Sequence, residues 1–152
     1  MCGITGFIQY GGGAAQDLSR RCQSMADTIV HRGPDAGGVW VDPSFPLALG
    51  HRRLSIIDLT DAGAQPMASA SGRYVLSYNG EVYNFPRLRQ EPGVSDYPYR
   101  GHCDTEVILA AVEHLGVAAA VSKLEGMFAF ALWDRQERCL WLARDRVGKK
   151  PL

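Results

Sequence analysis

The sequence predicts an α+β fold in which β-sheets are layered between helices. The predicted order is a strand, a helix, several strands, a second helix and a final pair of strands. In the segment 127–133, MFAFALW, apolar residues occupy both sets of alternating positions. Such a strand must be covered on both faces, which places it in a sandwiched layer. The 152 residues are 46% hydrophobic and 21% charged, a composition typical of one soluble globular domain.

The first half of the chain predicts strands around one helix. Residues 2–10 form a strand with Ile4 and Ile8 on one face and Phe7 on the other, and a glycine loop follows. The helix runs from Gln16 to Arg32 and ends at a Gly-Pro pair. Segments 37–41 and 47–57 are strand-like and are joined by a proline-rich turn. The apolar face of the helix comprises Leu18, Cys22, Met25, Ala26 and Ile29.

The second half predicts two hairpins around a helix. Residues 74–84 alternate about Asn79-Gly80, a pair typical of a hairpin turn, and the polar segment 85–101 is interpreted as a loop. Residues 104–116 form a helix with Asp104 as N-cap and Gly116 as the stop. Segments 127–134 and 138–145 form the second hairpin. The chain stops soon after this strand, so we expect it to be part of a longer protein.

The net charge and the cysteine spacing argue against several kinds of partner and site. Sixteen basic and sixteen acidic residues give a formal net charge of zero, so neither nucleic acid nor a membrane surface is an expected partner. No secretory signal or membrane span is recognisable, and we expect a cytoplasmic location. No metal site is predicted, because the four cysteines have no CxxC spacing and are interpreted as reduced thiols: Cys2, Cys22, Cys103 and Cys139.

Cys2 follows the initiator methionine directly. If Met1 is removed, one residue carries both a thiol and a free α-amine. Moving the proton from sulfur to nitrogen then costs only ~1 kcal/mol, so the amine can act as the base for its own side chain. Taken alone, an incidental cysteine at this position is the simpler interpretation.

Three further groups of residues could bind a substrate for the Cys2 thiol. Arg53 is a natural clamp for a carboxylate, although a surface arginine is the alternative. Asn79-Gly80 can form an oxyanion hole as well as a turn. Asp104 and Glu81 can bind an ammonium group, although a helix N-cap is the better interpretation of Asp104 taken singly. Together these groups favour a small zwitterion with an amide side chain, and glutamine is the obvious candidate.

Eight blocks follow one another along the chain: MCGITGF, HRGPDAGG, GHRRLSIIDL, AQPM, YNGEVYN, GHCDTEVIL, LEGMFAFALWD and RDRVGKKPL. In this order they resemble the class II glutamine amidotransferase domains, which are N-terminal-nucleophile hydrolases. The resemblance covers essentially all of residues 1–152. Within that family the blocks GHRRLSIIDL and RDRVGKKPL look most like the glutaminase domain of glutamine-hydrolysing asparagine synthetases. The implied fold is a four-layer αββα sandwich that lacks its last strands.

The resemblance also implies a role for each matched residue. Cys2 would be the nucleophile, and Asn79 and Gly80 would form the oxyanion hole. Glu81 and Asp104 would bind the α-ammonium group of glutamine. The carboxylate of glutamine would be bound by Arg53, and the segment after it would line the pocket: Leu54, Ser55, Ile56 and Ile57.

The implied reaction is hydrolysis of the glutamine side-chain amide through a γ-glutamyl thioester. In the family, the ammonia passes to a C-terminal synthetase domain that uses ATP and Mg²⁺ to make asparagine from aspartate. That domain is absent here, and this domain itself is expected to need no cofactor; a homodimer is a further expectation. Two alternatives stay open. The domain could serve another acceptor, such as a β-lactam, sugar or peptide-modifying synthetase, or it could bind glutamine without turning it over.

Overall fold

The computed structural model describes residues 2–54 and 63–152, and in this part of the chain the strands form two antiparallel sheets. The first sheet has the order β1-β3-β2 and the second has the order β4-β5-β6-β7. This arrangement confirms the predicted mixture of α and β structure with antiparallel pairing. The strands are β1 (Gly3–Ile8), β2 (Ala36–Val41), β3 (Leu47–Arg53), β4 (Met67–Ala68), β5 (Tyr74–Val82), β6 (Gly126–Asp134) and β7 (Cys139–Arg144).

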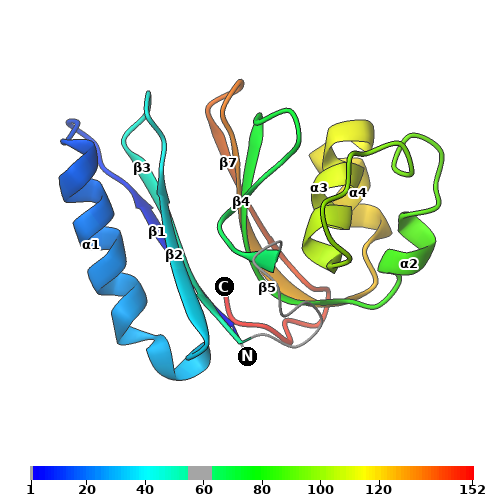
Figure 1. The fold of residues 1–152 in the computed structure, drawn as a ribbon, viewed down its shortest axis with the longest axis horizontal. Coiled ribbons are helices and arrows are strands. Elements are labelled where there is room, and N and C mark those ends of the chain that lie inside the picture. The colour runs from blue at the N-terminus through cyan, green and yellow to red at the C-terminus, as the bar shows by residue number, and fades with distance from the viewer. Residues whose placement is uncertain (1, 55–62) are drawn as a thin grey trace.

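Helices lie on the outer faces of the two sheets. Figure 1 shows α1 against the outer face of the three-stranded sheet, and α3 and α4 beyond the four-stranded sheet, with the two sheets facing each other. Among the described residues, no helix is long and apolar enough to cross a bilayer. The helices are α1 (Ala15–Thr28), the 3₁₀ turn η1 (Val30–Arg32), α2 (Phe85–Leu88), α3 (Asp104–Leu115) and α4 (Val117–Lys123).

The first helix is shorter than its apolar pattern predicts. It ends at Thr28, and the 3₁₀ turn η1 carries the chain on to Arg32. Of the predicted apolar face, Leu18, Cys22 and Ala26 are buried against the first sheet, whereas Met25 is 39% exposed. The periodicity therefore located the helix correctly and overestimated the width of its buried face.

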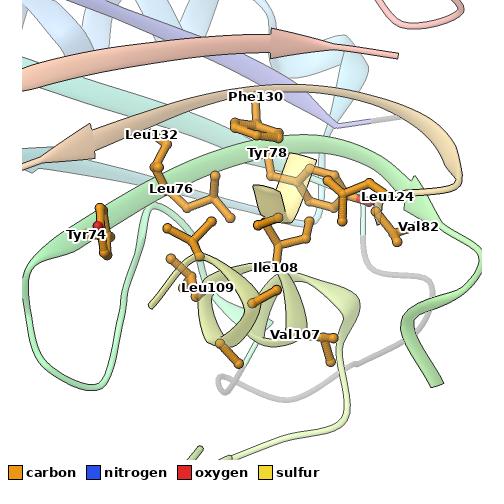
Figure 2. Packing of buried hydrophobic residues seen from close by; sticks show 14 of the residues in the cluster. Tyr74, Leu76, Tyr78, Val82, Val107, Ile108, Leu109, Leu124, Phe130 and Leu132 are labelled. Carbon is orange, nitrogen blue, oxygen red and sulfur yellow. The ribbon is translucent and has the colours of Figure 1, made fainter. Parts of the chain in front are cut away.

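Strand β6 is covered on both faces, as its sequence predicts. Trp133 and Ala131 pack between the two sheets in a cluster with Leu47 and Leu49 of β3. The alternate positions face the helices: Phe128, Phe130 and Leu132 belong to a second cluster with α3 and α4. Figure 2 shows this second cluster, with Phe130 and Leu132 above the side chains of α3.

The predicted hairpin at Asn79-Gly80 is wrong. Strand β5 runs without interruption from Tyr74 to Val82, and each of its nine residues has a partner on β6. Gly80 is required for a different reason, because a Cβ atom there would lie 2.3 Å from the carbonyl oxygen of Met127. Pairing with a strand that is distant in sequence overrides the local turn preference.

Two short helices were not predicted from the sequence. The polar segment 85–101, interpreted as a loop, begins with helix α2, and helix α4 follows directly after Gly116. Gly116 does end α3, with a φ of 79° that favours glycine. The hairpin of β6 and β7 is present as predicted, and Arg138 occupies its positive-φ position.

Candidate active site

A single pocket brings the predicted residues together from separate segments of the chain. Its walls come from the N-terminus, the end of β3, the second half of β5 and the start of α3. Ser55, Ile56 and Ile57, which were also predicted to line it, lie outside the described residues. The predicted residues found in the pocket wall are Cys2, Arg53, Leu54, Asn79, Gly80, Glu81 and Asp104.

Cys2 is placed by the pairing of β1 with β3. The register pairs Gly3 with Arg52, so Cys2 lies beside the end of β3. The Leu54 backbone N–H donates to Cys2 Sγ at 3.4 Å, and Sγ lies 3.7 Å from the Leu54 carbonyl oxygen. Arg32 Nε donates to the Cys2 carbonyl oxygen at 3.1 Å. Cys2 is half-buried, and Leu54 holds its thiol at the pocket wall while Arg32 holds its backbone.

The two adjacent arginines of β3 point to different surroundings. Arg53 lines the pocket. Arg52 points toward α1 instead, where its Nη1 lies 3.8 Å from Asp27 Oδ1. Successive side chains of a strand alternate between faces, so only one of the pair can enter the pocket. The structure therefore separates the candidate clamp from the arginine that forms an ordinary ion pair.

The edge of β5 leaves the Gly80 N–H directed toward the pocket. On this edge the Tyr78 N–H donates to Gln65 Oε1 at 2.7 Å, and the Val82 N–H donates to Asp104 Oδ2 at 3.0 Å. Gly80 lies between these residues and shares their orientation, because alternate residues of a strand point to the same edge. Strand β4 pairs only with Val75 and Leu76, so no described strand covers this edge at Gly80.

Asn79 and Glu81 point to the opposite face of β5 from Tyr78. Val75, which has the same alternation, packs between the two sheets, so these side chains also face the first sheet. Asn79 is buried and Glu81 is half-buried. An amide donor, a backbone N–H and a carboxylate thus meet at one end of β5.

Asp104 is the first residue of α3 and is not its N-cap. The capping position is held by Cys103, and the Asp104 carboxylate points to β5, where Tyr78 Oη donates to Oδ2 at 2.6 Å. Burial raises the pKa of Asp104, with a further contribution from Glu81, while the hydrogen bonds from Tyr78 and Val82 oppose that rise. The predicted capping role is therefore wrong, and the carboxylate is available to the pocket.

Several pocket residues were not predicted from the sequence. Gln65, Tyr78 and Lys150 all line the pocket. Gln65 belongs to the AQPM block, which the sequence pattern singled out without giving it a role. Lys150 belongs to RDRVGKKPL, and the Asp145 carboxylate accepts backbone N–H bonds from Lys149 at 2.7 Å and from Lys150 at 3.0 Å. That turn brings the C-terminal segment back to the pocket.

His51 lies behind the pocket and links the two sheets. Its Nε2 lies 2.9 Å from the Tyr78 carbonyl oxygen, so the neutral tautomer must carry its proton on Nε2. Nδ1 is buried and has no hydrogen-bond partner within residues 2–54 and 63–152. Burial lowers the pKa of His51 to about 4, and the nearby Arg53 guanidinium adds to that effect. A neutral histidine is therefore built into the wall between the sheets.

The chemistry offered by this pocket is nucleophilic attack on an amide of a small zwitterion. A thiol, two hydrogen-bond donors for an oxyanion, a guanidinium and two carboxylates line one cavity. The sequence profile of the glutamine amidotransferase domain matches residues 1–152. The chain belongs to the glutamine amidotransferase family.

Several named proteins are similar to this chain over its whole length. It is 41% identical to asparagine synthetase [glutamine-hydrolyzing] 1 of Bacillus subtilis strain 168, covering 100% of the chain and 24% of the relative. It is 38% identical to asparagine synthetase B of Escherichia coli K12, covering 100% and 26%. Identity to the amidase chry2 of Gibberella zeae is 38%, covering 100% and 24%. The chain thus spans about a quarter of the length of these relatives.

Proposed function

We propose that this glutamine amidotransferase domain hydrolyses the side-chain amide of glutamine with Cys2 as nucleophile. The observation that carries the proposal is the convergence of Cys2, Arg53, Asn79-Gly80 and Asp104 on one pocket, from segments up to 102 residues apart in sequence. The converging residues supply one partner for each polar group of glutamine.

Recognition of the substrate follows from charge and geometry. The Arg53 guanidinium binds the α-carboxylate with two parallel N–H bonds. Asp104 and Glu81 bind the α-ammonium group, which offsets the repulsion between these two carboxylates. This arrangement directs the side-chain amide toward Cys2.

The reaction begins once Met1 has been removed. The free α-amine of Cys2 takes the thiol proton, and the thiolate attacks the amide carbon. The oxyanion that forms is stabilised by the Asn79 side-chain amide and the Gly80 N–H. The α-ammonium group of Cys2 returns its proton to the leaving nitrogen. Ammonia then departs and leaves a γ-glutamyl thioester on Cys2. Water then attacks the thioester carbon, and the α-amine of Cys2 accepts a proton from the water. That proton passes to the leaving sulfur, so glutamate and the free thiol are released.

The ammonia is destined for a synthetase domain of the full-length protein. The similarity to asparagine synthetases supports ATP- and Mg²⁺-dependent synthesis of asparagine from aspartate as the consuming reaction. In this assignment the two sheets and their outer helices form the inner and outer layers of an αββα sandwich. Residues 1–152 then belong to the glutaminase domain, which needs no cofactor of its own.

A different acceptor for the ammonia is the second candidate. It is favoured by the 38% identity to a protein named as an amidase, which extends over the whole chain. The glutaminase site would be the same in both cases. Assaying the full-length protein with aspartate and ATP separates them, because asparagine forms only under the first proposal.

Steady-state glutamate release from Met1-free protein tests the glutaminase step. Cys2→Ala should abolish release, and Cys139→Ala is the matched control because that half-buried thiol lies on β7 and does not line the pocket. Glutamate release that is equal in the wild type and Cys2→Ala would refute the nucleophile assignment. Binding of glutamine without any turnover in the wild type would favour the non-catalytic alternative.

A further inference from the structure

Tyr78 joins two parts of the pocket wall to the histidine that lies behind it. Its hydroxyl donates to Asp104 Oδ2 at 2.6 Å, and its backbone N–H donates to Gln65 Oε1 at 2.7 Å. Its carbonyl oxygen lies 2.9 Å from His51 Nε2. Each polar atom of this residue is therefore occupied by a group from a different segment, and Asn79 follows it directly in the chain.

The ring of Tyr78 is fixed by packing. It is 3% exposed and belongs to the cluster between the second sheet and α3, where Figure 2 shows it with Ile108, Leu124 and Phe130. Burial raises the pKa of Tyr78 well above its usual value, and the neighbouring Asp104 carboxylate adds to the rise. The hydroxyl thus stays protonated and acts as the donor in its bond to Asp104.

Two donors converge on one oxygen of Asp104. The Tyr78 hydroxyl and the Val82 N–H both bind Oδ2, which fixes the rotation of the carboxylate at the N-terminus of α3. A buried carboxylate needs such bonds to remain ionised. Val82 supplies a backbone group that a side-chain substitution leaves in place, so the hydroxyl of Tyr78 is the contact that can be removed alone.

We propose that Tyr78 is a positioning residue for substrate recognition, whose hydroxyl holds Asp104 in the orientation that binds the α-ammonium group of glutamine. This proposal rests on the proposed glutaminase function. Because Tyr78 acts on the ammonium end of the substrate, its loss should weaken binding of glutamine and leave the attack on the amide unchanged.

Tyr78→Phe removes the hydroxyl and keeps the ring in its cluster. The experiment compares glutamine with glutaramate, which has the same amide and carboxylate but no α-amine, as a substrate or, where its turnover is too slow, as a competitive inhibitor. We expect the KM for glutamine to rise about tenfold with kcat unchanged, since a hydrogen bond to a charged group is lost. The constants for glutaramate should stay at the wild-type values.

Two further variants separate positioning from a general structural role. Tyr99→Phe is the matched control, because it also removes a tyrosine hydroxyl bond, to the Val94 carbonyl oxygen at 3.1 Å, away from the pocket lining. It should leave the KM for both compounds unchanged. In an Asp104→Asn background, Tyr78→Phe should produce no additional rise in the KM for glutamine, since the two changes act on one interaction.

The possible outcomes separate failure of the Tyr78 proposal from failure of the glutaminase proposal. An unchanged KM for glutamine, an equal loss for glutamine and glutaramate, or a loss confined to kcat would each overturn the role of Tyr78 in an active enzyme. Equal glutamate release from the wild type and Cys2→Ala would instead refute the glutaminase function and this proposal with it. Denaturant unfolding of Tyr78→Phe establishes that the variant is folded before its kinetics are compared.

Discussion

His51 Nε2 lies 2.9 Å from the carbonyl oxygen of Tyr78, and this contact joins β3 of the first sheet to β5 of the second. The ring is completely buried, and no described residue offers Nδ1 a hydrogen-bond partner. A proton added at Nδ1 would create a buried N–H donor without an acceptor. The histidine is therefore kept neutral, and its neutrality has a consequence for stability.

We predict that acid weakens the fold through His51. Its folded pKa of about 4 lies below the unfolded value of 6.5, so its contribution to stability is complete above pH 6.5 and is lost as the pH falls toward 4. The loss amounts to about 3 kcal/mol in the free energy of unfolding, on the order of 1.4 kcal/mol per pKa unit. Urea unfolding between pH 4 and 7 measures it.

His51→Gln provides the control for that titration. Glutamine can place an N–H donor near the position of Nε2 and does not ionise. The slope of unfolding free energy against pH in this window should therefore be smaller in His51→Gln than in the wild type. Asp42, Asp134 and Asp145 do not account for the slope, since their pKa values are lowered below 3.8. Equal slopes in the two proteins would contradict the role of His51.

Gly80 should not tolerate even a methyl group. A Cβ atom at this position would lie 2.3 Å from the Met127 carbonyl oxygen and 2.6 Å from Phe128 Cα, both in the backbone of β6. Gly80→Ala should lower the free energy of unfolding by about 1–3 kcal/mol, because the strands must move apart. It should also reduce glutaminase activity, since the Gly80 N–H moves with the strand.

Gly13→Ala is the matched substitution for Gly80→Ala. The nearest atom to its Cβ would be Nε2 of Gln9, at the far end of a half-buried side chain and not in the backbone. Its effect on unfolding free energy should stay within about 0.5 kcal/mol, as for most surface positions. Similar losses in both variants would show that crowding against β6 is not the cause.

The two arginines of β3 should differ sharply in their effect on glutamine binding. Arg53→Lys replaces the fork that binds a carboxylate through two bonds, so the KM for glutamine should rise about tenfold or more. Arg52→Lys should leave the KM unchanged, because that side chain faces Asp27 of α1. Steady-state kinetics of both variants at saturating and limiting glutamine measures the difference. An equal effect of the two substitutions would argue against Arg53 as the clamp.

Patterns that depend on local spacing predicted much of this fold. The buried face of α1 and the two covered faces of β6 follow from periodicity, since every third or fourth residue, or every second one, must meet a core. The turn at Asn79-Gly80 was predicted from an equally local signal and was wrong. Pairing with β6 decided its structure, and a strand partner almost fifty residues away is not visible in local spacing.

The residues of the site divide in the same way, into those that sequence can predict and those that depend on tertiary contacts. Cys2, Arg53, Asn79, Gly80, Glu81 and Asp104 could be proposed from their chemistry and from the resemblance, and the pocket contains them all. Gln65, Tyr78 and His51 act through hydrogen bonds to the backbone of β5 or to Asp104. Such contacts have no sequence signature, because they depend on how two sheets and a helix are placed relative to one another.

Cys2 should become acylated by glutamine once it is the first residue of the chain. Single-turnover reaction with glutamine, acid quenching and mass analysis of the N-terminal peptide test this most directly. We expect a mass increase of one γ-glutamyl group on Cys2, only in chains that have lost Met1. Turnover by chains that retain Met1, or a γ-glutamyl group found on another cysteine instead, would contradict it.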